Sequence, residues 1–242
     1  MLRAVLFGVT ASSALVIGAV LGTRVRMPQR LLAMLLAFAA GSLMTALAFE
    51  LFEESYRQGG AVPSAIGFAL GAGVFTAISA WLDRRVQRRS RRGSAKLNTG
   101  GAAGLALLAA VTLDGVPENL ALGVTLAGET GGLVLLVAIF LSNLPESLVG
   151  AASMREQGHS TGFVLGTWGL AAVLLALAVV AGQALLAGVS GVGIAVPLAF
   201  AGGAVVASLA DTLMPQAYEQ GGPAVALATA AGFLLSYLLS TV

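Results

Sequence analysis

Long apolar stretches separated by short polar connections constrain this chain more than any other feature. Of its 242 residues, 57% are hydrophobic and only 10% are charged, whereas a soluble domain carries about 25% charged residues. A water-soluble fold is therefore excluded. Because a membrane-spanning helix needs about 20 mostly apolar residues, these stretches predict an all-α, polytopic membrane protein.

Glycine, proline and charge clusters divide the apolar sequence into eight segments. We predict membrane spans at about 4–22, 31–52, 61–82, 101–126, 132–154, 161–187, 192–217 and 222–242. Together they form one transmembrane domain, residues 1–242, packed as a bundle of eight transmembrane helices. The 32 glycines favour close approach of the helix backbones.

Basic residues predict the orientation, because Arg and Lys concentrate in cytoplasmic loops. Most of them lie at 84–100, and others lie at 24–30 and at Arg155. We therefore predict a cell-membrane protein with a cytosolic loop at 84–100 and both termini outside. This loop is better explained as a topology anchor than as a nucleic-acid patch, so the expected surroundings are a lipid bilayer and no nucleic acid.

Acidic residues inside the apolar spans are the most informative functional feature. They are Glu50, Asp114, Glu118, Glu146 and Asp211. A charge at the centre of a membrane helix costs about 2.5–3.5 kcal/mol on the mildest scale, so such residues are normally paired or line a path. Every Lys and Arg lies in a predicted loop or at a span end. The neutralising charge must then come from a bound cation or from protons.

Two neighbouring spans carry similar strings around a proline. Asp114-Gly115-Val116-Pro117-Glu118 lies in the fourth span, and Ser142-Asn143-Leu144-Pro145-Glu146 lies in the fifth. Asp114 and Glu118 are four residues apart, which places them on one helix face. Each proline also leaves a backbone carbonyl without its helix partner. Carboxylate, amide and hydroxyl oxygens suit a hard divalent cation, so Asp114, Glu118, Ser142, Asn143 and Glu146 are the predicted metal ligands.

Two further acids extend the predicted ion path. Glu50, with Glu53 and Glu54 beside it, is expected at the outer mouth, where carboxylates attract cations. For Glu53 and Glu54 a solvated surface explains the sequence nearly as well. Asp211 lies toward the cytosolic end of the seventh span, either as an exit ligand or as a solvated helix terminus.

These strings resemble the ZIP (Zrt/Irt-like protein) family of divalent metal transporters, especially its bacterial branch. The family's His-Asn-x-Pro-Glu-Gly pattern aligns with residues 114–119, and a similar pattern aligns with residues 142–147. Residues 198–219 and 37–54 resemble two further helices of the family. The resemblance implies eight spans, a central metal site between helices 4 and 5 with Glu118 and Glu146 bridging two ions, and passive or proton-linked uptake toward the cytosol.

The sequence departs from the family pattern at Asp114, Gly115 and Thr212. Asp114 stands where the family has histidine, and the loss of the imidazole leaves only oxygen ligands. Zinc prefers nitrogen and sulfur donors, whereas oxygen donors suit manganese, magnesium or calcium. Zinc is the family default, and these residues favour manganese, iron or another hard divalent cation.

We therefore expect a transporter of divalent metal ions that is not an enzyme and holds no cofactor other than its transported metal. The main alternative is a ZIP-like membrane protein that senses metal or acts as a scaffold without transport. An intramembrane hydrolase that uses Asp114 and Asp211, and a transporter of protons or organic cations, are two further alternatives. The sequence leaves open whether the protein is a homodimer.

Overall fold

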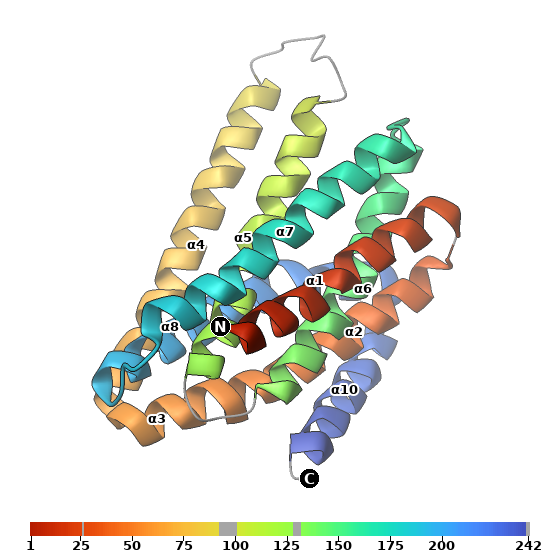
Figure 1. The fold of residues 1–242 in the computed structure, drawn as a ribbon. Helices are drawn as coiled ribbons and strands as arrows, with labels where there is room; N and C mark the ends of the chain where they lie inside the picture. The colour runs from red at the N-terminus through yellow and green to blue at the C-terminus, as the bar shows by residue number, and fades with distance from the viewer. Residues whose placement is uncertain (26, 92–100, 128–131, 241–242) are drawn as a thin grey trace.

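A computed structural model of the chain describes residues 1–25, 27–91, 101–127 and 132–240, without the side chains at 82–83, 85–91, 101–111, 113–114 and 240. Within these ranges every regular element is a helix (Figure 1), which confirms the all-α prediction. The elements are α1 (Leu2–Arg24), α2 (Gln29–Ala46), η1 (Leu47–Phe52), α3 (Glu53–Gly59), α4 (Ala61–Arg91), α5 (Gly101–Ala127), α6 (Leu133–Glu156), α7 (Thr161–Leu186), α8 (Val192–Ser208), η2 (Leu209–Leu213), α9 (Met214–Gly221), η3 (Gly222–Ala224) and α10 (Val225–Ser240).

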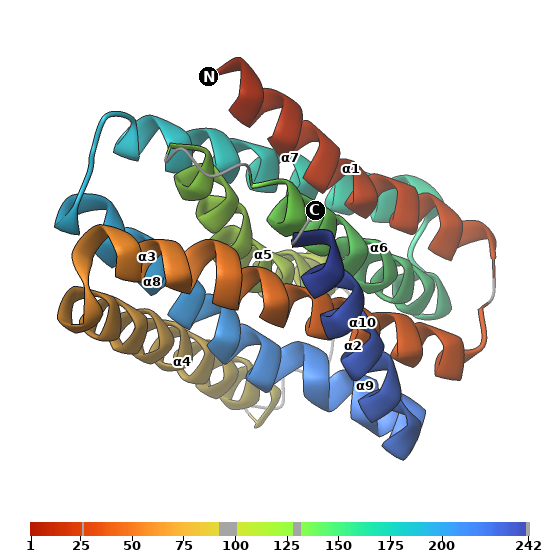
Figure 2. The same ribbon diagram turned by 90° about the horizontal axis from the view of Figure 1, so that it is seen from below.

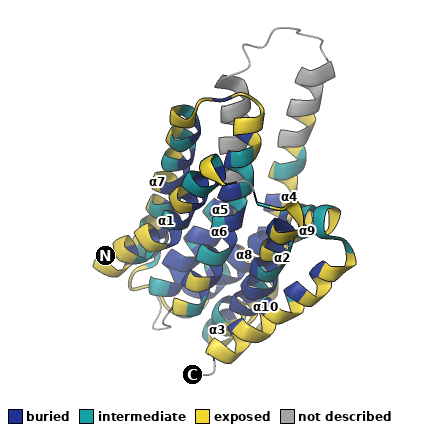
Figure 3. Cartoon of the chain, turned by 90° about the vertical axis from the view of Figure 1, so that its right-hand side faces the viewer, coloured by how far each residue is buried: buried dark blue, intermediate teal, exposed yellow. Residues whose placement is uncertain are grey.

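Six helical stretches of the described chain are long and apolar enough to cross a membrane. They are Leu2–Arg24, Gln29–Gly59, Ala61–Trp81, Leu133–Glu156, Thr161–Leu186 and Val192–Leu239. Buried residues gather between the helices, and exposed residues cover the outer faces (Figure 3). Many of the exposed side chains are large and apolar, including Leu70, Leu177, Leu227 and Leu238. A soluble monomer rarely exposes so large an apolar surface, so these faces suit a lipid environment.

Three predicted boundaries were wrong. The second span does not stop at 52, because η1 and α3 continue the helix to Gly59. Residues 84–91 of the predicted basic loop are the last turns of α4, since arginine favours a helix nearly as well as alanine does. The seventh span continues through η2 and α9 to Gly221.

An internal repeat organises the helices. A Tyr-x-Gln-Gly-Gly string occurs at 56–60 and again at 218–222, and each copy follows a π-helix, η1 or η2. The chain turns at the last glycine of each copy, where Gly60 has a φ of 78° and Gly222 a φ of 64°. The long helices before these turns, α2–η1–α3 and α8–η2–α9, run in opposite directions (Figure 2). The repeated string thus marks equivalent turns at the ends of two antiparallel helices.

The helices form two layers (Figure 2). The first layer consists of α1, α5, α6 and α7, and α1 packs on α6 while α7 packs on α5. The second layer consists of α2–η1–α3, α4, α8–η2–α9 and α10, and α2 packs on α10 while α8 packs on α4. Both helices with a Pro-Glu string lie in the first layer, and both π-helices lie in the second.

Glycine contacts tighten each layer internally. A Cβ on Gly41 would collide with the Thr229 carbonyl of α10, and a Cβ on Gly203 would collide with the Phe68 carbonyl of α4. The first layer contains the same kind of contact, because a Cβ on Gly123 would overlap the Val179 carbonyl. Wherever a Cβ on a described glycine would overlap the backbone of another helix, that helix belongs to the same layer.

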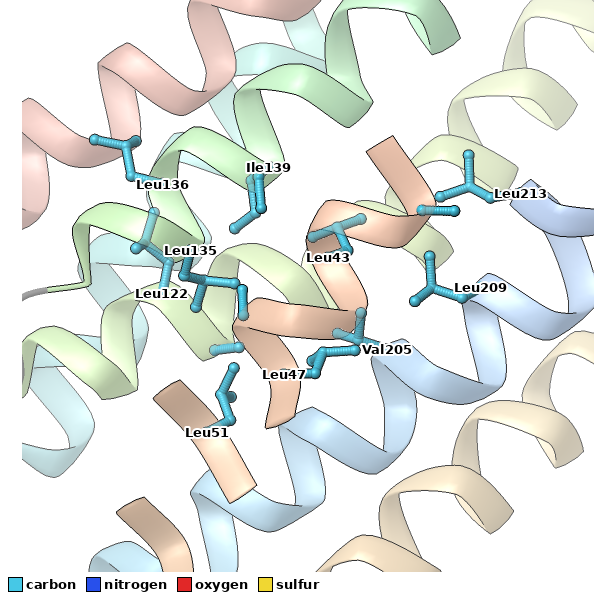
Figure 4. Packing of buried hydrophobic residues seen from close by; sticks show 14 of the residues in the cluster. Leu43, Leu47, Leu51, Leu122, Leu135, Leu136, Ile139, Val205, Leu209 and Leu213 are labelled. Atoms are coloured by element: carbon cyan, nitrogen blue, oxygen red, sulfur yellow. The ribbon is translucent and has the colours of Figure 1, made fainter. Parts of the chain in front are cut away.

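The contact between the two layers differs from the backbone contacts inside each layer. It is an apolar cluster of leucine, isoleucine, valine and alanine side chains, of which the larger ones are labelled in Figure 4. Its labelled members come from α2, η1, α5, α6, α8 and η2, and are Leu43, Leu47, Leu51, Leu122, Leu135, Leu136, Ile139, Val205, Leu209 and Leu213. Each layer is thus held together by close backbone contact, whereas the two layers meet through side chains.

Gly203→Ala should lower the free energy of unfolding by about 1–3 kcal/mol, the usual cost of overpacking, because the Phe68 carbonyl must move. Gly73→Ala is the matched control, since a Cβ at this position on α4 meets nothing within 4 Å. Alanine there should leave stability unchanged or raise it by roughly 0.5–1 kcal/mol. Thermal unfolding of both variants in detergent measures the difference, and equal stability of the two would contradict the packing described.

Candidate metal centre

The two Pro-Glu strings lie inside continuous helices. Pro117 is within α5 and Pro145 is within α6. Glu118 is only 4% exposed, and Glu146 is half-buried. The structure therefore places both glutamates in the interior parts of their helices, as predicted.

The residue after each glutamate makes the same hydrogen bond. Asn119 Nδ2 donates to the Gly115 carbonyl at 2.9 Å, and Ser147 Oγ donates to the Asn143 carbonyl at 2.7 Å. Each bond adds a side-chain contact to the turn that contains the proline. The two strings are thus alike in local structure as well as in sequence.

The face beside each glutamate packs within the first layer. On α6, Asn143 Nδ2 donates to the Ala11 carbonyl at 3.4 Å, and Ser147 Oγ lies 3.3 Å from the Ala14 carbonyl. On α5, Gly115 and Gly123 face α7. Each glutamate is displaced by about 100° around its helix from the residue next to it, and so lies away from this packing face.

Helix periodicity relates both glutamates to residues of the apolar cluster. Residues four apart share a helix face, so Glu118 shares its face with Leu122 and Glu146 shares its face with Ser142. Leu122 belongs to the apolar cluster, as does Ile139, two turns before Glu146 on α6 (Figure 4). The helix faces that carry the two glutamates thus also contribute residues to this cluster.

The predicted amide and hydroxyl ligands are engaged in packing. Asn143 is 1% exposed and uses its amide N–H on α1, as described above. Ser142 is also 1% exposed and donates its hydroxyl to the Ile139 carbonyl at 3.0 Å. Both keep oxygen lone pairs for a cation, but Asn143 lies on the face that packs against α1.

Glu50 has a well-defined partner that the sequence did not predict. It lies in η1, and its carboxylate accepts hydrogen bonds from the first turn of α6. The distances are 3.1 Å from Val134 N to Oε1 and 3.0 Å from Leu135 N to Oε2. An anion at a helix N-terminus is favoured both by the unpaired N–H groups and by the helix dipole. In this structure Glu50 therefore caps the N-terminus of α6. Its place at the outer mouth of an ion path stays a prediction.

Asp211 lies in η2 and accepts a 2.6 Å hydrogen bond from Ser79 Oγ of α4. It is exposed, but it does not end a helix, because α9 follows η2 directly. Of the two alternatives for Asp211, the solvated helix terminus does not agree with the structure, and the exit ligand stays a prediction. Both Glu50 and Asp211 lie in π-helical turns, which frequently occur at functional sites.

Glu54 and Gln58 form a polar network that sequence reasoning missed. Glu54 was treated as an outer or solvated residue, but it is 4% exposed. It pairs with Arg57 at 3.4 Å and accepts a 2.8 Å hydrogen bond from Gln58 Nε2. Gln58 Oε1 in turn accepts from the Gly191 N–H at 3.3 Å. The Tyr-x-Gln-Gly-Gly string, which occurs twice in the sequence, is the signal that could have drawn attention to this turn.

The structure does not bring all the predicted ligands together. Among the described side chains, no three of Asp, Glu and His gather into a group that would hold a metal ion. The backbone of Asp114 lies in α5, one turn before Glu118, but its side chain is outside the described residues. The metal centre therefore stays a prediction that centres on Glu118 and Glu146.

Comparison with known proteins adds no family to this description. No protein family model matches the chain, and no curated protein has significant sequence similarity to it. The resemblance to ZIP transporters thus depends on the short strings described above.

Asn143→Asp tests whether Asn143 serves packing or metal binding. Because the amide N–H faces the Ala11 carbonyl, aspartate should lower stability by about 1 kcal/mol, the scale of a hydrogen bond between membrane helices. It should leave the stabilisation by added Mn²⁺ unchanged. The control is Thr125→Ala, which removes a buried 2.9 Å hydrogen bond to the Ala121 carbonyl within α5 alone. Thermal unfolding with and without Mn²⁺ measures both effects, and stronger Mn²⁺ stabilisation of Asn143→Asp would make Asn143 a ligand.

Proposed function

We propose that this protein transports divalent metal ions across a membrane, with Glu118 and Glu146 as the central ligands. The observation that carries the proposal is the pair of equivalent Pro-Glu turns on α5 and α6, each inside a helix of the same layer and each followed by the same side-chain hydrogen bond. Asp114 and Ser142, one turn earlier on their helices, complete the proposed oxygen ligand set. Asp211 and Glu50 lie along the proposed path.

Eight spans are part of this proposal. The six apolar stretches become eight if α5, with its 27 residues, is added and the 48-residue stretch Val192–Leu239 is divided at Gly222. The basic residues then place both termini outside. This arrangement puts the Pro-Glu turns near the middle of their spans, where a charged side chain is most costly.

Charge explains why these acids favour a cation. The spans contain basic side chains only at their ends, and α5 and α6 are otherwise rich in apolar residues. Two glutamates that face one interface raise the cost of keeping both ionised unless a cation lies between them. A divalent ion neutralises both at once, and the absence of cysteine from the chain favours a hard cation such as manganese over zinc.

The two layers suggest how the ion would cross. Close glycine contacts make each layer a unit, and the side-chain contact between layers allows one to rock against the other. Because Glu118 and Glu146 belong to the first layer, such rocking would expose them in turn to the two sides of the membrane. Transporters built from inverted repeats commonly work in this way.

Uptake of Mn²⁺ into proteoliposomes tests the proposal. Glu118→Gln and Glu146→Gln should each reduce uptake to the level of empty vesicles, because each removes one of the two central charges. Glu156→Gln is the matched control, since Glu156 is exposed at the last residue of α6. Size-exclusion chromatography establishes that the variants are folded.

A panel of Zn²⁺, Mn²⁺, Fe²⁺, Co²⁺, Cd²⁺ and Mg²⁺ at several pH values identifies the ion and any coupling to protons. Unchanged uptake by both central variants would contradict the site. Saturable Mn²⁺ binding without uptake by the native protein would instead favour a metal sensor or scaffold.

A further inference from the structure

The contact between Glu50 and α6 is unusual because a carboxylate from one layer caps a helix of the other. Gly132, the N-cap residue of α6, has a φ of 62° and provides no side-chain cap. The first turn of α6 is capped by both oxygens of Glu50. Hydrogen bonds donated to an ionised carboxylate are roughly twice as strong as those between neutral groups, so this contact is a substantial link between the layers.

The π-helix sets the position of Glu50. A π-helical turn adds one residue to a helix, and the flanking Leu47 and Leu51 are buried at 4% and 0% exposure. These leucines anchor η1 in the apolar cluster between the layers (Figure 4). The side chain of Glu50 therefore reaches α6 from a turn that is itself fixed to the interface.

The link lies beside the apolar cluster through which the layers meet. Apolar contacts have no directional preference and tolerate sliding, whereas two hydrogen bonds to Val134 and Leu135 require one relative position of η1 and α6. In the proposed topology the N-terminus of α6 and η1 both lie toward the outer side. The contact thus holds the layers together at that side.

We propose that Glu50 is a releasable latch that closes the outer end of the path between the layers. The inference rests on the proposed function. Bound to the Val134 and Leu135 N–H groups, Glu50 keeps the first turn of α6 against η1. Released, it lets the layers part and exposes the face of α6 that leads to Glu146.

A divalent cation is the natural trigger of the release. The N-terminus of a helix carries the equivalent of about half a positive charge, whereas the cation carries two. A cation that approaches from outside therefore competes with the helix for the carboxylate of Glu50. This competition couples the arrival of the ion to the opening of its path.

Thiol labelling of a single cysteine tests the latch, because the chain contains no cysteine of its own. Ile139→Cys places the thiol on α6 at a position with 0% exposure, in the cluster between the layers (Figure 4). In proteoliposomes a membrane-impermeant maleimide added from outside should label it slowly. Glu50→Gln in this background should raise the labelling rate about tenfold, the scale expected for the loss of one charge-assisted hydrogen bond.

The second measurement is the labelling rate in the presence of Mn²⁺. Mn²⁺ is chosen because it binds thiolates more weakly than zinc does, and so leaves the introduced cysteine free to react. Added Mn²⁺ should accelerate labelling when Glu50 is present and should have little effect in Glu50→Gln. Glu53→Gln is the matched control, because Glu53 is exposed and lies at the start of α3. Glu50→Asp, which keeps the charge but shortens the reach, should also label fast.

The outcomes separate the latch from the proposed function. Equal labelling of the native background and Glu50→Gln, in folded protein that transports Mn²⁺, would overturn the latch and leave the transport proposal standing. Fast labelling of Glu50→Gln in a protein that never transports Mn²⁺ would support the latch and overturn the transport proposal. Fast labelling of Glu53→Gln to the same degree would also contradict the latch.

Discussion

The burial of carboxylates in an apolar helix bundle is the constraint on which the rest of this structure depends. Glu118 is almost completely buried, and its helix offers no basic residue along the apolar part of its sequence. Ionised groups in such surroundings are strongly disfavoured without compensation. The proposed function assigns this charge to the binding of a cation from solution, which the oxygen-only composition of the two strings favours.

The distribution of small and large residues determines which parts of the bundle can move relative to one another. Glycines such as Gly41 and Gly203 bring helices into backbone contact inside each layer, and leucines fill the contact between the layers. Packed interiors respond to force as units, so the plane between the layers is where relative motion costs least. Glu50 reaches across this plane to the first turn of α6, and in the proposed function it is the residue that couples ion binding to the relative position of the layers.

Much of the fold could be predicted from the sequence, because long apolar runs determine helices in a membrane almost alone. The α3 helix and the end of α9 escaped prediction, since residues 53–59 and 218–221 are too polar to be counted as span. The cap on α6 could not be predicted either, because Glu50 and Val134 are brought together by tertiary packing between layers. The Pro-Glu turns were found because their signal is local, whereas the burial of Glu54 depends on how α3 packs against α8.

A crystal structure of the protein soaked with Mn²⁺, recorded at a wavelength where manganese scatters anomalously, tests the central claim most directly. The account predicts an anomalous peak between α5 and α6, within coordination distance of the carboxylates of Glu118 and Glu146. Two glutamates that point into separate surroundings, or that are each paired with an arginine while the soaked crystal shows no peak between them, would contradict it.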